Sequence, residues 1–246
     1  MDPKHESLPL LFTSCLLDSD GERTMRQLGK TTASSLLRYF FNGDVVLWRN
    51  FPEPLYPVAR SGLHEIETSL AEPKTKNERA SAQFFEKRYE LASSLTEHSA
   101  RYSWIIFAYP GVIALRNWDH LFENENADVL ISPGADGTPI DSFFAVRAEI
   151  WVTFLAAWTE VRQSPIPPEN ELAAILNSTS FQTAEFERGE VVTPFDDPID
   201  IRDLMEAAVV DLTGGKAEEQ TKLAFALHMM RTFGDKDGLF LDLMES

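Results

Sequence analysis

The stretch DSFFAVRAEIWVTFLAAWTEVRQ, residues 141–163, determines the predicted fold. At about 100° per residue, helical spacing places its large apolar side chains on one stripe. The other faces also hold apolar residues and several alanines, so the predicted helix is apolar on most sides. Such a helix lies in the middle of a helical protein. The stripe consists of Phe143, Ile150, Phe154, Trp158 and Val161.

Helical periodicity also dominates the rest of the chain, and alternation typical of strands is scarce. We expect helices near residues 22–41, 55–71, 77–109, 111–127, 140–163, 168–178, 199–213, 216–233 and 238–245. Only residues 44–48 and 190–193 read as strands, too little for a sheet-based fold. The prediction is a single all-α domain over residues 1–246, an orthogonal or bundle-like array of about eight or nine helices around a buried helix near 140–163. Residues 1–20 are a candidate extended N-terminal segment.

The composition excludes several classes of protein. The chain has 246 residues, a formal net charge of −17 and 43% hydrophobic residues, which excludes an acidic disordered chain. Nucleic acids and anionic membranes are polyanions that basic patches bind, so neither is an expected partner. Cys15 is the only cysteine, and no secretory signal or membrane-spanning stretch is recognisable. We therefore expect a soluble, cytoplasmic protein.

No cofactor or metal is expected from the motifs. The sequence has no glycine-rich phosphate loop and no dinucleotide fingerprint. One cysteine cannot form a cysteine cluster, and no two histidines have the spacing of metal ligands on a helix.

Arg147 is the unexpected residue of the central stretch. It falls inside the apolar stripe, where an unpaired guanidinium would be very costly. One interpretation is a structural arginine that is paired with a core carboxylate or reaches solvent from the start of the helix. The other is an anchor for an anionic or carbonyl-bearing ligand in a cavity.

His98 and Tyr102 form a second candidate pair. On a helix over residues 77–109 they lie one turn apart, at the edge of an apolar stripe, so they can form a hydrogen bond. Histidine is the usual general base near neutral pH, and tyrosine can donate to a developing oxyanion. The alternative is a core histidine with a structural hydrogen bond.

All five tryptophans lie between residues 48 and 158, which suggests an aromatic cavity there. We predict His98, Tyr102 and Arg147 as catalytic residues of a cofactor-independent enzyme or ligand-binding protein, for acid/base chemistry such as cyclisation, isomerisation or elimination. The expected ligand is an apolar or aromatic small molecule with an anionic or carbonyl group. The alternative function is a non-enzymatic acidic helical module for protein–protein interaction. The predicted substrate-binding residues are Phe143, Trp118, Trp151, Phe154 and Trp158.

Overall fold

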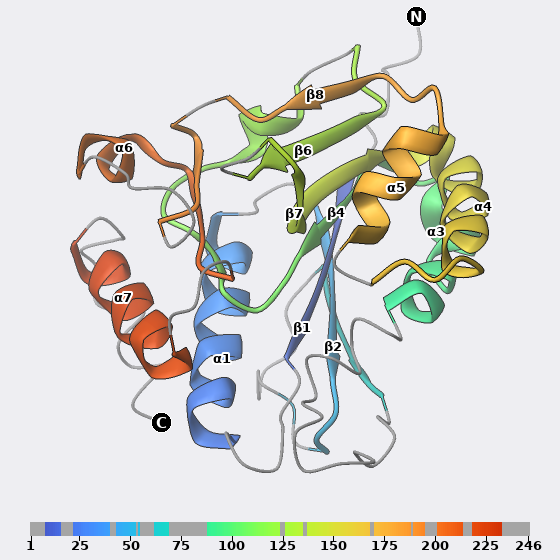
Figure 1. Ribbon diagram of the computed structural model, residues 1–246. Helices are drawn as coiled ribbons and strands as arrows, with labels where there is room; N and C mark the ends of the chain where they lie inside the picture. Colours follow the sequence, from blue (N-terminus) through green and yellow to red (C-terminus); the bar gives the residue numbers. More distant parts are fainter. Residues whose placement is uncertain are drawn as a thin grey trace, which may run out of the picture.

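The all-α prediction is wrong, because the structure is a mixed α/β fold. It contains a seven-stranded sheet and a three-stranded sheet (Figure 1). The computed structural model describes residues 8–15, 22–39, 43–52, 54, 62–68, 88–123, 126–134, 137–167, 170–187, 189–194, 201–213 and 218–232.

The large sheet has the order β3-β2-β1-β4-β7-β6-β8. Neighbouring strands among β3, β2, β1 and β4 are parallel, whereas β7 is antiparallel to both β4 and β6. The carboxyl ends of β1, β2 and β4 therefore lie at the same edge as the amino end of β7, and we call this the carboxyl edge. The strands are β1 (Leu8–Cys15), β2 (Asp44–Arg49), β3 (Leu63–Glu67), β4 (Tyr102–Ala108), β6 (Val129–Pro133), β7 (Pro139–Arg147) and β8 (Thr183–Glu185).

The small sheet begins where the chain leaves β4. The turn at Gly111 has a φ of 106°, a left-handed conformation that favours glycine. The chain then enters β5 (Val112–Ala114), which pairs antiparallel with β10 (Val209–Asp211), and β10 pairs with β9 (Val191–Val192). Gly111 accepts a hydrogen bond at 2.9 Å from the backbone N–H of Leu212, just beyond β10.

Helices cover both faces of the large sheet (Figure 1). On one side α4 (Trp151–Arg162) and α5 (Glu171–Ser178) form a core with β4 and β7. On the other side α1 (Glu22–Tyr39) contacts β1, β5 and α7 (Glu219–Thr232). The shorter helices are α3 (Thr96–Ser99), α6 (Ile201–Glu206) and the 3₁₀ turns η1 (Asp119–Phe122) and η2 (Ala148–Ile150). In the part of the chain that the structure describes, no helix is both long enough and apolar enough to cross a bilayer.

The central helix expected over residues 140–163 is two elements. Residues 139–147 form β7, and the helix α4 begins only at Trp151. Phe144 and Val146 face the core below α4 and α5, while Phe143 and Ala145 face the core on the opposite side. A strand that is buried on both faces has a continuous apolar run, which periodicity alone does not distinguish from a buried helix.

Other expectations had mixed outcomes. The helices over 22–41, 168–178 and 216–233 are confirmed by α1, α5 and α7, and the strand-like stretches by β2 and β9. The helices over 55–71, 77–109, 111–127 and 199–213 are wrong in whole or part, because these ranges contain β3, β4, β5 and β10. Within residues 1–20, the part 8–15 forms β1, inside the large sheet. The helix expected over 238–245 lies outside the described residues.

Candidate functional site

The strand order makes the carboxyl edge between β1 and β4 a candidate ligand site. From β1 the chain passes through α1 to β2 on one side, whereas β4 lies on the other side of β1. In open α/β sheets, ligands bind outside the carboxyl ends of the strands at such a reversal of strand order. Two buried polar clusters lie at this edge, one on each face of the sheet.

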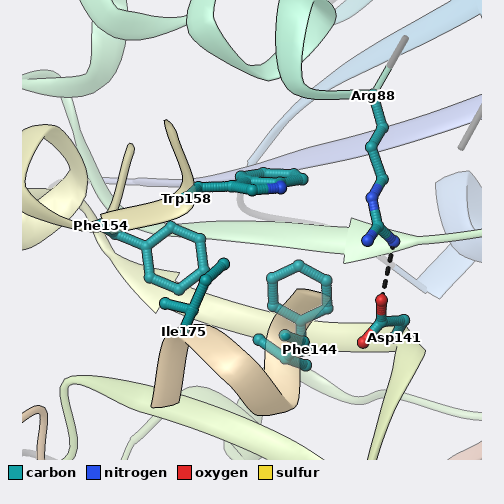
Figure 2. Close-up of a pocket in the computed structure, with 7 residues that line it drawn as sticks. Arg88, Asp141, Phe144, Phe154, Trp158 and Ile175 are labelled. Carbon is teal, nitrogen blue, oxygen red and sulfur yellow. Dashed lines mark ion pairs between the residues drawn. The ribbon is translucent and has the colours of Figure 1, made fainter. Parts of the chain in front are cut away.

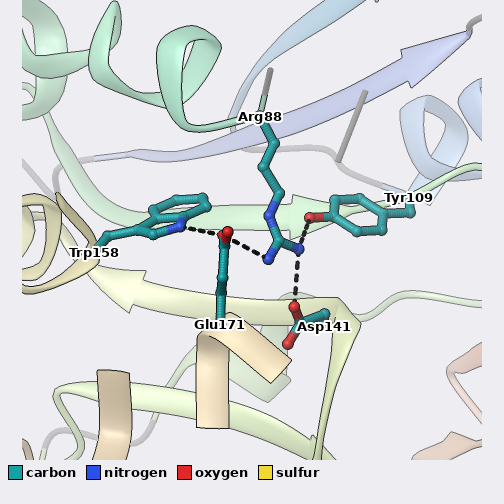
Figure 3. A network of polar contacts seen from close by, with 5 residues as sticks. All are labelled: Arg88, Tyr109, Asp141, Trp158 and Glu171. Atoms are coloured by element: carbon teal, nitrogen blue, oxygen red, sulfur yellow. Dashed lines mark hydrogen bonds and ion pairs between the residues drawn. The ribbon is translucent and has the colours of Figure 1, made fainter. Parts of the chain in front are cut away.

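The first cluster is centred on Arg88, in a helical segment over residues 88–93. Its Nη1 lies 2.9 Å from Asp141 Oδ2 and donates to the Tyr109 hydroxyl at 2.9 Å. Its Nη2 donates to Glu171 Oε2 at 2.9 Å, and the Trp158 indole donates to the same oxygen at 2.6 Å. Figure 3 shows the five side chains converging. We call these residues the Arg88 cluster; they link the end of β4, the start of β7, α4 and α5.

Burial and charge shift the pKa values of this cluster. Burial raises the pKa of Asp141 to about 6, against the opposing effect of Arg88 and with a further rise from Glu171. Burial also raises the pKa of Tyr109 to about 12. Burial alone would lower the pKa of Arg88, but Tyr109, Asp141 and Glu171 together raise it above its usual value. The guanidinium therefore stays charged, and Asp141 is the group that titrates near neutral pH.

A small pocket lies beside the Arg88 cluster (Figure 2). Its interior has no room for a water molecule. Binding sites for small molecules usually measure ~300–1,000 Å³. The pocket in this structure therefore cannot hold a cofactor or a nucleotide. Its lining consists of Arg88, Asp141, Phe144, Phe154, Trp158, Leu172 and Ile175.

The second cluster is centred on Asp211, at the end of β10 and only 1% exposed. The Ser142 hydroxyl donates to its Oδ2, and the Thr213 backbone N–H and hydroxyl donate to its Oδ1 at 2.8 and 2.6 Å. Lys222 of α7 donates to the Thr213 carbonyl at 3.0 Å. This cluster joins β7 of the large sheet to β10 of the small sheet and to α7.

Two of the three residues predicted as catalytic, Arg147 and Tyr102, lie away from both clusters. Arg147 lies at the carboxyl end of β7, at the opposite edge of the sheet. Its Nε donates to the Ala127 carbonyl at 3.0 Å, and its guanidinium lies 4.5 Å from the Trp104 ring centroid. Tyr102 begins β4, and its hydroxyl donates to Asp44 at 2.8 Å. Burial, then this hydrogen bond, raises the pKa of Tyr102 to about 12.

His98 lies in α3, which ends at Ser99. The helical spacing that would have paired His98 with Tyr102 is therefore absent, because Tyr102 already belongs to a strand. The catalytic roles of Arg147, Tyr102 and His98 stay predictions.

The sheet separates the predicted substrate-binding residues. Trp151, Phe154 and Trp158 lie in the core below α4 and α5. Phe143 and Trp118 lie in the core on the other face, with ring centroids 5.8 Å apart. Two of the five, Phe154 and Trp158, line the pocket in Figure 2. Their role in binding is likewise still a prediction.

Sequence reasoning missed Arg88, although a signal was present. In the stripe predicted for residues 77–109, Arg88 falls between Phe84 and Leu91 on the same helical face. A cation in an apolar stripe was the feature that drew attention to Arg147, and it applied equally to Arg88. Asp141 and Glu171 had no comparable signal, because each follows a proline-containing loop and resembles an ordinary acidic residue at the start of an element.

Metal ligands do not gather at either cluster. Among the residues that the structure describes, no group of three or more His, Cys, Asp or Glu side chains is arranged to hold a metal ion.

Comparison with known proteins finds a likeness in fold. No protein-family model matches the chain, and no curated protein sequence matches it. A solved structure, a glycosyltransferase involved in the glycosylation of the major capsid of PBCV-1, matches with a TM-score of 0.55 and 12% sequence identity. The match covers 90% of this chain and 99% of that protein. The predicted all-helical enzyme with an aromatic cavity is therefore wrong, since the fold is α/β and resembles that of a glycosyltransferase.

Proposed function

We propose that the protein transfers a glycosyl group from an activated sugar donor, a nucleoside diphosphate sugar, that binds at the carboxyl edge of β1, β2 and β4. The likeness to a glycosyltransferase over 90% of the chain is the observation that supports this most. A fold alone does not imply a function, and the strand order around β1 gives a second support. The reversal of strand order at β1 supports a ligand site at the carboxyl edge.

A donor of this class brings a negatively charged diphosphate. At the carboxyl edge, Arg49 ends β2 and pairs in register with Cys15 at the end of β1. Its Nε lies 3.3 Å from Glu65 and its Nη1 3.5 Å from Glu67. Arginine is well suited to bind phosphate because its guanidinium presents several donors in one plane. We therefore assign the donor diphosphate to Arg49, which would exchange a glutamate for a phosphate oxygen.

The test is direct binding to the purified full chain. Isothermal titration calorimetry with a panel of nucleoside diphosphate sugars, with and without Mg²⁺ or Mn²⁺, should identify at least one donor, and release of the nucleoside diphosphate should follow in the presence of an acceptor. Arg49→Met should weaken donor binding by about tenfold or more, the loss expected for a hydrogen bond between charged groups.

Arg162→Met is the matched control. Arg162 is an exposed arginine at the end of α4, with its guanidinium 5.3 Å from the Tyr89 ring centroid. This variant should bind the donor within about twofold of the wild-type value. Lack of binding to every donor in the panel, or equal losses in the two variants, would refute the proposal.

A further inference from the structure

The Arg88 cluster contains more negative than positive charge. Arg88 supplies one cation, whereas Asp141 and Glu171 supply two carboxylates. The side chains of these residues are only 2%, 8% and 7% exposed. If both carboxylates are ionised, one negative charge without a counter-charge in the cluster is buried away from water, which is unfavourable.

The two carboxylates differ in their hydrogen bonds. Glu171 Oε2 accepts hydrogen bonds from both Arg88 and Trp158. Asp141 Oδ2 contacts the Arg88 guanidinium, and the backbone of Leu172 also hydrogen-bonds this carboxylate, but within the described part of the chain no side chain donates to its Oδ1. The pocket beside it is too narrow to supply a water molecule instead. Asp141 is therefore the carboxylate that takes up a proton.

We propose that the Arg88 cluster is a proton-dependent clasp: a proton on Asp141 holds the start of β7 against α4 and α5, and loss of that proton loosens this contact. The step is a simple dissociation, in which the carboxylic acid of Asp141 becomes a carboxylate and the proton passes to solvent. Arg88 keeps its charge throughout. This inference is independent of the proposed glycosyl transfer.

The groups that face Asp141 favour such a switch. Arg88 faces it from the helical segment 88–93, Glu171 from α5, and Tyr109 from the end of β4 (Figure 3). Burial and Glu171 favour the acid, whereas Arg88 and a hydrogen bond from the backbone of Leu172 favour the carboxylate; burial outweighs the rest and raises the pKa of Asp141 to about 6. The clasp should therefore change state between about pH 5 and pH 7.

The first test follows the proton itself. In full-length protein labelled with ¹³C at aspartate carboxyl groups, NMR should show one resonance that titrates near pH 6 and is missing from Asp141→Asn. Glu171→Gln should lower the pKa of Asp141 by about one unit, a tenfold change in proton affinity, because it removes the second negative charge. The proposal is overturned if no aspartate titrates above pH 5, or if the resonance persists in Asp141→Asn.

The second test follows the contact. Amide hydrogen exchange in α5, corrected for the intrinsic effect of pH on exchange, should increase about tenfold between pH 5 and pH 7.5 in the wild type. It should be independent of pH in Asp141→Asn, and Glu160→Gln, at an exposed position of α4, should behave like the wild type. Titration of Asp141 without a change in exchange would also overturn the clasp. If Asp141→Asn does not fold, Glu171→Gln decides: it should shift the exchange profile to lower pH, and an unshifted profile refutes the proposal.

Discussion

Asp141 and Ser142 are consecutive residues of β7, and their side chains bind partners on opposite faces of the large sheet. Asp141 lies 2.9 Å from Arg88, on the side of α4 and α5, whereas Ser142 donates to Asp211 of the small sheet. Successive side chains of a strand point to opposite faces, so two adjacent residues anchor both layers. The carboxyl edge is thereby fixed from both sides.

Removal of the Arg88 cation should destabilise the protein strongly. Arg88→Met retains an apolar stem but leaves Asp141 and Glu171 buried without their cation. Removal of one partner of a buried ion pair lowers the free energy of unfolding by about 3–5 kcal/mol. Urea denaturation of Arg88→Met and of the exposed control Arg162→Met measures the difference, and the control should lose less than about 1 kcal/mol. Similar losses in both variants would show that the Arg88 cluster contributes little to stability.

The Ser142 hydroxyl should contribute to the link between the two sheets. Ser142→Ala removes a hydrogen bond to the buried carboxylate of Asp211 and should cost about 1–3 kcal/mol. Ser178→Ala is the matched control, because its exposed hydroxyl donates only to Ile175 of its own helix. Thermal unfolding of both variants gives the comparison. A loss for Ser142→Ala no larger than for Ser178→Ala would contradict the assigned link.

Gly111 should tolerate a side chain less well than Gly137. Both residues have positive φ, at 106° and 80°, so alanine is strained at either position. A Cβ at Gly111 would also lie 3.1 Å from Thr213 Cγ2, whereas nothing lies within 4 Å of a Cβ at Gly137. We expect Gly137→Ala to lower the free energy of unfolding by about 1–2 kcal/mol and Gly111→Ala to lower it more. Equal free energies of unfolding would mean that Thr213 moves aside without cost.

Stability should depend on pH through Asp141. Its pKa rises from 3.8 to about 6 on folding, so the folded state binds the proton more tightly. The stability of the wild type relative to Asp141→Asn should therefore be greatest near pH 4, fall by up to about 3 kcal/mol as the pH approaches 6, and stay level above it. Denaturation curves at pH 4, 5, 6 and 7 measure this difference. If the stability of the wild type relative to Asp141→Asn instead rises with pH, the prediction is contradicted.

Arg147 provides a direct test of the site predicted from sequence. A role in ligand binding requires that Arg147→Met abolish donor binding. The contacts with Ala127 and Trp104 instead predict that this variant keeps donor binding and loses about 1–2 kcal/mol of stability. Calorimetry and urea denaturation of the same preparation separate the two outcomes.

The sequence predicted the elements that are buried on one side only. In helix α7, the buried residues Leu223, Ala226 and Met229 recur at helical spacing, whereas Ala224 and His228 are exposed. Strands β4 and β7 were missed because both faces are buried: Ile106 and Phe107 lie in different cores although they are adjacent. Local periodicity contains no information about such a strand, whose partners come from distant parts of the chain.

The candidate site was missed for a related reason. Arg88, Asp141 and Glu171 are separated by dozens of residues, and only the pairing of β4 with β7 and the packing of α5 bring them together. An unusual cation in an apolar stretch can be recognised in a sequence, but its counter-charges cannot. The aromatic residues around Trp151 were correctly expected to be buried, whereas their division between two cores depends on the sheet.

The pairing of β5 with β10 also has a consequence for biosynthesis. These strands lie about 100 residues apart, so β5 has no partner from β10 until most of the chain has left the ribosome. At about 5–20 residues per second, that interval lasts roughly 5–20 s. During it the Val112–Ala114 edge can pair with other chains, which makes nascent protein most prone to aggregation at this stage. Co-translational chaperones should therefore matter most for the yield of folded protein after β5 emerges and before β10 does.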